Sequence, residues 1–201
     1  MVDRLKYKSH IAMAGKEDSI LLIIDMQDRL VNSPVFPIYE RGKIVENIKA
    51  LIKTANVFKL PVMVVEQKKL GETIPEIKEL LHQYNMYHPI EKLCFSSYGN
   101  EEFRRRLEEI NRTRVLICGV ETHICVIQTA LDLVENGYST QIIKDATSSH
   151  LKTDFETAIG RVRGDGVVIT TTEMLIYELL KEAGADEFKK VLEIVKDKRG
   201  R

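Results

Sequence analysis

The chain has 201 residues, which fits a single domain spanning 1–201, and its 30 basic and 30 acidic side chains cancel at pH 7. This balance provides no global positive field, so we expect neither nucleic acid nor an acidic membrane surface as a partner. No stretch approaches 18 consecutive apolar residues and no signal-peptide pattern opens the chain, so we expect a soluble protein of the cytoplasm.

Short apolar runs alternate with amphipathic stretches from the start of the chain. The continuous runs "SILLIID" (19–25) and "PVMVVEQ" (61–67) are typical of strands that are covered on both faces. Between them, apolar residues recur at helical spacing from Ile44 to Ala55. The first third therefore predicts a strand–helix–strand unit.

The alternation continues to the end of the chain. After the second strand we expect a helix at 74–84, a weak strand near 89–95, a helix at 100–110, the strand "TRVLICGV" (113–120) and a helix at 122–136 capped by Gly137. The strand "STQIIKD" (139–145), a helix near 153–163, the strand "GVVIT" (166–170) and helices beginning near Thr172 and Asp186 follow. This order predicts an α/β fold with a mostly parallel sheet and helices on both faces.

Polar residues follow several of these strands at the edge where such sheets bind ligands. Asp25 follows a run of consecutive apolar residues, so its carboxylate is expected to be partly removed from water and to need a partner. Lys92, at the end of the third predicted strand, is the candidate partner. Position alone equally allows an aspartate that caps the turn after its strand, and a lone lysine there is usually a solvated charge.

The three cysteines have different expected roles. Cys125 lies in the first turn of its predicted helix, where unpaired N–H groups and the positive helix end favour a thiolate. The alternative, a small buried hydrophobe, fits Cys118 within its apolar strand. Cys94 would share a strand face with Lys92 and could lie near the site without acting. His123 is about 200° from Cys125 on a helix, so we expect no direct Cys–His dyad.

Other motifs favour a site without metal or nucleotide. His82, His88 and His150 share no ligand spacing with acidic residues, and the odd cysteine count suits neither a zinc site nor a disulfide framework. "TSSH" (147–150) is expected to cap the next helix rather than to form a Ser–His hydrolase, because no G-x-S-x-G elbow is present. Nucleotide binding lacks support because neither G-x-G-x-x-G nor a Walker motif occurs.

Three segments, in their order and spacing, resemble the isochorismatase-like cysteine hydrolase family. They are "LLIIDMQ" (21–27), "IEKLCFSSY" (90–98) and "CGVETHICVIQTALDLVENGY" (118–138). The resemblance covers about residues 18–180. It implies a Rossmann-like, three-layer αβα sandwich with six strands in the order 3-2-1-4-5-6, a small-molecule substrate and a homo-oligomer.

The resemblance also implies a catalytic triad of Asp25, Lys92 and Cys125. A cis peptide implied at Val120–Glu121 would turn the N–H of Glu121, with that of Cys125, toward a developing oxyanion. Asp25 would take the thiol proton, the thiolate would attack an amide-like carbonyl, and water would hydrolyse the thioester. The expected substrate contacts in the surrounding loops are Gln27, Leu30, Gln67, Ser97 and Thr122.

Departures from other family members narrow the expected chemistry. The family's nicotinamidases carry an Asp/His metal cluster after the second strand, where this chain reads "EQKKLGETIPEI" (66–77), so we expect no metal and no other cofactor. Members that cleave the vinyl ether of isochorismate can lack the cysteine, so Cys125 favours cleavage of a C–N bond through an acyl-enzyme. Two alternatives stay open: vinyl ether cleavage with Asp25 as acid, and an α/β binding protein without turnover.

Overall fold

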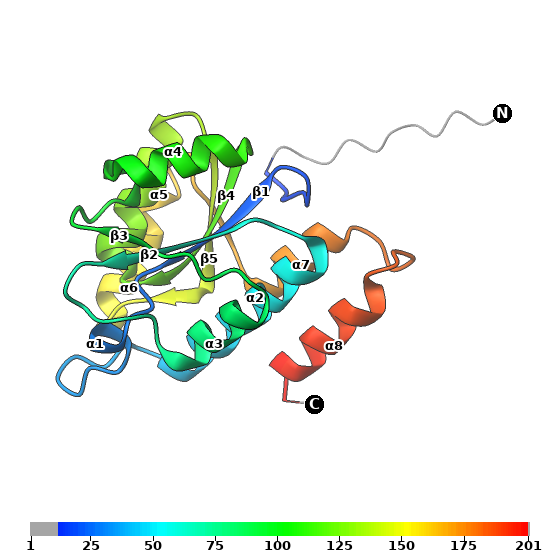
Figure 1. Ribbon diagram of the computed structural model, residues 1–201, viewed down its shortest axis with the longest axis horizontal. Helices are drawn as coiled ribbons and strands as arrows, with labels where there is room; N and C mark the ends of the chain where they lie inside the picture. Colours follow the sequence, from blue (N-terminus) through cyan, green and yellow to red (C-terminus); the bar gives the residue numbers. More distant parts are fainter. Residues whose placement is uncertain (1–11, 201) are drawn as a thin grey trace.

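The computed structural model describes residues 12–200, which form a six-stranded sheet between two layers of helices (Figure 1). The strands are β1 (Ser19–Ile24), β2 (Val62–Gln67), β3 (Ile90–Lys92), β4 (Arg114–Val120), β5 (Ser139–Ser148) and β6 (Val168–Thr170). All neighbouring strands are parallel, in the order β3-β2-β1-β4-β5-β6. The predicted fold class, layers and strand order are confirmed. Among the described residues, no helix has the length and apolar character needed to cross a bilayer.

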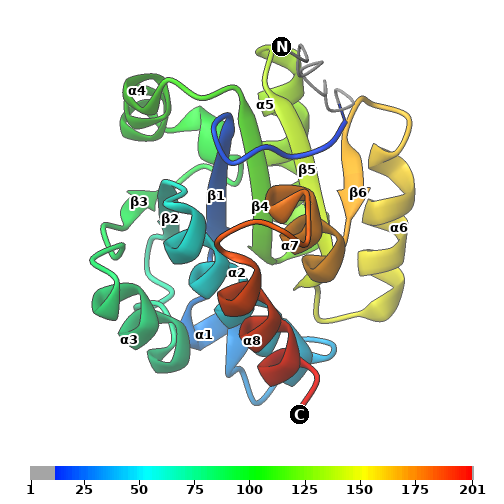
Figure 2. The same cartoon turned by 90° about the vertical axis from the view of Figure 1, so that its right-hand side faces the viewer.

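Two groups of helices cover the two faces of the sheet (Figure 2). One face carries α2 (Arg41–Phe58), α3 (Pro75–Gln83), α7 (Thr172–Leu180) and α8 (Phe188–Lys198), and the other carries α4 (Glu101–Ile110), α5 (Ile127–Glu135) and α6 (Lys152–Val162). Alternate residues of β1 enter the two cores, Leu21 and Ile23 on the α2 side and Leu22 and Ile24 on the α5 side. Because both faces are covered, β1 reads as a continuous apolar run.

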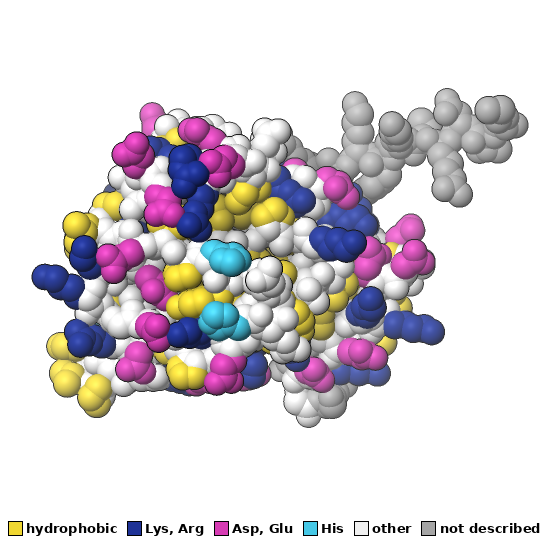
Figure 3. Space-filling view, viewed as in Figure 1, with side chains coloured by type: hydrophobic (Ala, Val, Ile, Leu, Met, Phe, Trp, Pro, Cys, Tyr) yellow, Lys and Arg dark blue, Asp and Glu magenta, His cyan; other side chains and the backbone are white. Residues whose placement is uncertain are grey.

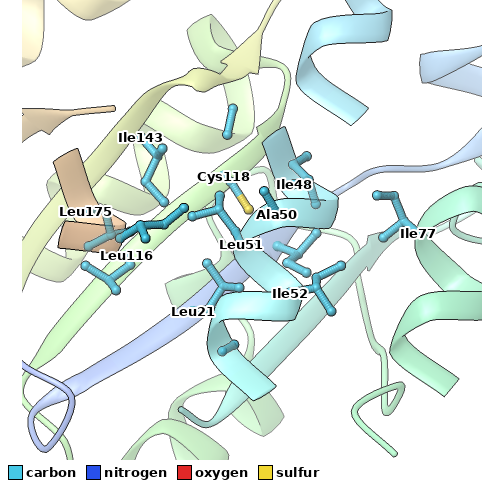
Figure 4. Packing of buried hydrophobic residues seen from close by; sticks show 14 of the residues in the cluster. Leu21, Ile48, Ala50, Leu51, Ile52, Ile77, Leu116, Cys118, Ile143 and Leu175 are labelled. Atoms are coloured by element: carbon cyan, nitrogen blue, oxygen red, sulfur yellow. The ribbon is translucent and has the colours of Figure 1, made fainter. Parts of the chain in front are cut away.

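Cys118 is part of the core between the sheet and α2. Its side chain is fully buried and lies beside Leu51 and Ile48 of α2 (Figure 4). Burial raises the pKa of this thiol far above its usual value, so it stays protonated and apolar in character. The prediction that Cys118 is a small buried hydrophobe is confirmed.

The start of α6 differs from the sequence prediction. Its N-cap is Leu151, which makes no side-chain capping bond, so the predicted "TSSH" cap is wrong. The two serines of that motif bond to distant parts of the chain instead. Ser148 Oγ donates to the carbonyl of Tyr39 at 2.8 Å, and Ser149 Oγ lies 2.8 Å from Nδ1 of His123. Capping is a local pattern, and here tertiary contacts override it.

Gly119 permits a close approach of β4 to the end of β1. Its φ is +113°, and a Cβ at this position would lie 2.0 Å from the carbonyl oxygen of Ile24. The register of β4 against β5 also shifts between Ile117 and Gly119. Only glycine avoids both the steric overlap and the backbone strain at this position. The contact fixes the spacing between the residue that follows β1, Asp25, and the turn that follows β4.

We expect Gly119→Ala to lower the free energy of unfolding by about 3 kcal/mol or more, because the added methyl group meets backbone rather than a movable side chain. Urea denaturation measures this change. Gly42→Ala is the matched control, since nothing lies within 4 Å of its added Cβ and alanine favours the helix there. Equal stability of the two variants would contradict the proposed role of Gly119.

Candidate active site

The ends of β1, β3 and β4 bring the predicted triad together at the carboxyl edge of the sheet. Asp25 follows β1, Lys92 ends β3, and Cys125 lies in the π-helical turn η2 (Thr122–Val126) that follows β4. Lys92 Nζ donates a hydrogen bond to Asp25 Oδ2 at 2.8 Å, and both side chains are fully buried. The Cys125 thiol interacts with both of these charged groups and is only 6% exposed.

The backbone changes direction at Asp25. Its φ is +49°, a left-handed conformation that aspartate tolerates better than most residues. Its N–H donates to the carbonyl of Val65 at 3.1 Å, which ties the residue to β2. Burial raises the pKa of the Asp25 carboxyl above its usual value, while the Lys92 ammonium opposes this shift. Asp25 is therefore a stronger proton acceptor than a surface carboxylate.

Lys92 is held by three oxygen atoms. Besides Asp25 Oδ2, its ammonium donates to Gln67 Oε1 at 2.7 Å and to the carbonyl of Cys94 at 3.4 Å. Gln67 Nε2 in turn donates to the carbonyl of Leu93 at 2.8 Å, which fixes the orientation of the amide. A buried ammonium is tolerated when its N–H groups are satisfied in this way. Gln67, predicted as a substrate contact, therefore positions Lys92.

The thiol of Cys125 is neutral in this arrangement. Burial, followed by the charge of Asp25, raises its pKa to about 12 against the opposing effect of Lys92. The expectation that the helix start favours a thiolate is thus wrong for the unliganded site, because desolvation dominates. The interaction with the thiol lowers the pKa of Asp25, yet Oδ1 of Asp25 has no partner of hydrogen-bonding geometry within residues 12–200.

The peptide between Val120 and Glu121 is cis, as the family resemblance implies. The carbonyl of Glu121 accepts hydrogen bonds from the N–H groups of Ile124 and Val126 at 3.1 and 3.3 Å. Its carboxylate oxygen Oε1 lies 2.8 Å from Nδ1 of His150 and accepts the backbone N–H of the same residue at 3.1 Å. Glu121 is therefore anchored at both its carbonyl and its side chain, and the role of its N–H toward an oxyanion stays a prediction.

Gln27 connects the loops that follow β1 and β2. Its side chain is 1% exposed, and its Nε2 donates to the carbonyls of Gln67 and Gly71 at 2.9 and 2.5 Å. Its Oε1 accepts the N–H of Gln67 at 2.7 Å. Since backbone groups occupy the amide, Gln27 supports the framework around Asp25, and a contact with substrate is not needed to explain it.

The other two polar residues expected to touch substrate are also buried. Ser97 lies at the start of the short 3₁₀ turn η1 (Ser97–Gly99), and its N–H donates to Oγ1 of Thr129 at 2.8 Å. Thr122 is fully buried, and in the described part of the chain its Oγ1 has no hydrogen-bond partner. Ser97 thus couples the loop after β3 to α5, next to the turn that carries Cys125.

A cavity of about 240 Å³ opens beside Glu121. Leu30, Phe36 and Ile38 form its apolar wall, and Glu121 and His150 contribute polar atoms. Leu30, one of the predicted substrate contacts, thus lines this cavity. Asp25, Lys92 and Cys125 line neither this cavity nor a larger one of about 820 Å³ between α7, α8 and the residues before β1. We place the candidate binding site at the smaller cavity because Glu121, which lines it, directly precedes the turn that carries Cys125.

Sequence reasoning missed Phe36 and His150 as cavity residues. The position of His150 directly after β5 is a usable signal, because the carboxyl ends of parallel strands converge. Phe36 lies in the irregular loop between α1 (Asp28–Val31) and α2, where no periodic pattern predicts its direction. Its ring packs edge-on against that of His150, with 5.9 Å between the centroids.

Comparison with known proteins identifies the family. The isochorismatase domain model matches residues 19–174. The chain belongs to the isochorismatase family. It is 34% identical to isochorismatase family protein 1B of Dictyostelium discoideum over 186 residues, which cover 91% of this chain and 88% of that protein.

Solved structures share the fold of this family member. The MAR1 ribonuclease of Caenorhabditis elegans superposes with a TM-score of 0.80 at 29% identity, covering 91% of this chain and 92% of that one. The YcaC gene product of Escherichia coli, described as an octameric hydrolase of unknown specificity, superposes with a TM-score of 0.83 at 22% identity and covers 96% of each chain. The protein thus has the fold of isochorismatase-family hydrolases.

We expect Asp25→Asn to make Cys125 more reactive toward iodoacetamide. The charge of Asp25 raises the pKa of the thiol, so its removal lowers that pKa while Lys92 still favours the thiolate. Each unit of lowered pKa increases the thiolate fraction about tenfold at a pH well below the pKa. The measurement is the rate of alkylation at Cys125, followed by peptide mass mapping at about pH 8.

Glu91→Gln is the control, because it removes an exposed charge from the same strand as Lys92. Circular dichroism establishes that each variant is folded. A rate for Asp25→Asn equal to or below that of the wild type would contradict the electrostatic account of the thiol.

Proposed function

We propose that the protein is a cysteine hydrolase that cleaves an amide-like C–N bond of a small molecule through a thioester on Cys125. The observation that carries the proposal is the fully buried Asp25–Lys92 pair beside a protonated thiol. A carboxylate whose pKa is raised by burial is suited to accept a proton from that thiol. Burial of both charges is costly, and their position beside the thiol suggests that the pair serves the chemistry of Cys125.

The proposed reaction begins when the substrate carbonyl reaches the sulfur. Asp25 takes the proton of Cys125 as the sulfur attacks the carbonyl carbon. The N–H groups of Glu121 and Cys125 stabilise the negative oxygen of the tetrahedral intermediate, a contribution of about 3 kcal/mol for each donor in well-studied hydrolases. Collapse of the intermediate breaks the C–N bond, and the leaving nitrogen takes the proton from Asp25.

Water completes the proposed cycle. Asp25, ionised again, accepts a proton from a water molecule that attacks the thioester carbonyl. The carboxylic acid product leaves, and the sulfur regains its proton from Asp25. Lys92 keeps Asp25 in its ionised form before each of the two proton transfers, because a positive charge at 2.8 Å favours the carboxylate.

A small substrate fits the dimensions of the site. The cavity beside Glu121 measures about 240 Å³, which is below the range of roughly 300–1,000 Å³ typical of pockets for drug-sized ligands. Its wall is mostly apolar, through Leu30, Phe36 and Ile38. We infer an amide, ureide or hydroxamate with a short apolar acyl group as the substrate class.

Vinyl ether cleavage is the second candidate reaction. The raised pKa of Asp25 favours it as well, since a carboxyl that holds its proton to higher pH is available as a proton donor closer to neutral pH. In that reaction Cys125 would be a bystander. The response to replacement of Cys125 therefore separates the two reactions.

Cleavage of RNA is an alternative because one structural relative is described as a ribonuclease. The neutral charge balance argues against RNA as the substrate here. On the face seen in Figure 3, basic and acidic side chains are interspersed rather than gathered into a positive field. Assays of turnover should therefore include single-stranded RNA as a substrate beside the small amides.

A homo-oligomer also stays a proposal for this chain. Several large apolar side chains are exposed in loops at the carboxyl edge of the sheet, including Phe36 at 63%, Leu93 at 72% and Leu151 at 54%. Exposed apolar surface of this kind is typical of contacts between protein chains. A cytoplasmic location is likewise an expectation from the sequence alone.

We expect Cys125→Ala to abolish amine release from small amides, ureides and hydroxamates while the fold is retained, because the nucleophile is lost. Cys118→Ser should instead lower the free energy of unfolding by about 1–3 kcal/mol, since it places a hydroxyl in an apolar core. Its activity for each folded molecule should remain near that of the wild type. Amine release and urea denaturation measure the two effects.

Full amide turnover by Cys125→Ala would overturn the nucleophile assignment. Retained cleavage of a vinyl ether by this variant, with no amide turnover in the wild type, would support the second reaction. RNA cleavage without amide turnover would contradict both proposed reactions. Absence of turnover on amides, vinyl ethers and RNA would support a binding protein.

A further inference from the structure

Three side chains that the proposed reaction does not use lie together beside the cavity. They are Glu121, His123 and His150, and one potential ligand atom from each lies within 4.8 Å of the others. Glu121 and His123 follow β4, while His150 follows β5, so the parallel sheet brings them to the same edge. Their side chains are 13%, 25% and 29% exposed, which leaves the cluster accessible from solvent.

We propose that this cluster binds a divalent first-row transition metal ion such as Zn²⁺, Co²⁺ or Ni²⁺. Two imidazoles and one carboxylate form a donor set that suits these ions better than Mg²⁺ or Ca²⁺, because Mg²⁺ and Ca²⁺ favour oxygen ligands. One carboxylate and two neutral imidazoles carry a single negative charge, which a dication more than compensates. The site follows β4 and β5, and so differs in position and residues from the Asp/His metal cluster that the family's nicotinamidases carry after the second strand.

Hydrogen bonds around His123 orient its ring for this role. Its Nδ1 lies 2.8 Å from Ser149 Oγ, and the tautomer that donates this N–H leaves a lone pair on Nε2. Asp154 Oδ2 lies 3.9 Å from Nε2, so a second carboxylate borders the cluster. Metal-binding histidines commonly have their other ring nitrogen held by such an outer partner. Ser149 is fully buried, which makes it unsuitable as a nucleophile and suitable as a support.

Binding requires a modest inward movement of the donors. Ligand atoms around a tetrahedral ion at about 2.1 Å lie roughly 3.4 Å apart, whereas the present donors are separated by up to 4.8 Å. Rotation of exposed imidazole rings can supply this change. Glu121 Oε1 now lies 2.8 Å from Nδ1 of His150, and the ion would replace the proton between them or bind at Nε2.

Two features keep Glu121 and the cavity in place during that change. The backbone N–H of His150 donates to Glu121 Oε1 at 3.1 Å, a contact that does not depend on the ring. Arg29 also lines the cavity, and its side chain is held in position because its guanidinium donates a hydrogen bond to the carbonyl of Lys69 at 2.8 Å. Without metal, the same residues form a hydrogen-bonded cluster that only anchors Glu121, and this is the alternative to be tested.

The test uses full-length protein freed of metal by a chelator, in a Cys125→Ala background that removes the reactive thiol as a ligand. Co²⁺ is added and followed by its visible d–d absorption, and Zn²⁺ is added in a calorimeter. We expect one equivalent of Co²⁺ to bind with a spectrum of nitrogen and oxygen ligands. His123→Gln and His150→Gln should each weaken binding of both ions by about tenfold or more.

The matched control replaces His10, His82 and His88 by Gln, which removes every other histidine and should leave the affinity unchanged. A second measurement avoids variants of the cluster: Co²⁺ should broaden the imidazole proton signals of His123 and His150 before those of other histidines. Absence of binding, or binding that persists in His123→Gln and His150→Gln but is lost in the control, would overturn the proposal.

Discussion

The buried ion pair between Asp25 and Lys92 is the interaction on which the rest of the site depends. Removal of two charges from water is costly, so each must be matched by a partner and by further hydrogen bonds. Gln67 and the carbonyl of Cys94 supply these bonds for Lys92, and Gln27 accepts the backbone N–H of Gln67 at the end of β2. Most of the polar residues around the site thus maintain the pair rather than line a cavity.

The all-parallel sheet explains how the pair can form. Asp25 and Lys92 are 67 residues apart, on strands separated by β2, and both lie at carboxyl ends. Gly119 sets the spacing to β4, so the turn that carries Cys125 lies beside the same edge. The same convergence brings His150 to Glu121, although nothing in the pattern of the sequence links them. One architectural rule therefore accounts for both the triad and the Glu–His–His cluster.

Sequence reasoning predicted what depends on periodicity and on strand ends. The continuous apolar runs specify buried strands, and the family resemblance named the strand order, the triad and the cis peptide. It did not predict the direction of the pKa shift of Cys125, because the depth of burial depends on distant segments. It also did not foresee the hydrogen bonds of Gln27 and Gln67, because their backbone and Lys92 partners become neighbours only in the folded chain. The loop around Phe36 has no periodic pattern, so the direction of its side chains could not be predicted from the sequence.

We infer that the proton of the resting site stays on the sulfur of Cys125, because the effect of burial on its pKa outweighs that of the nearby Lys92 ammonium. The most direct measurement is the ultraviolet absorbance of thiolate in the wild type minus that in Cys125→Ala, followed as the pH rises. Since burial raises the pKa of Cys125 to about 12, the account predicts no increase that depends on Cys125 through the pH range where a free thiol, with a pKa of about 8.5, ionises. A thiolate signal that is present at neutral pH and is lost in Cys125→Ala would contradict it.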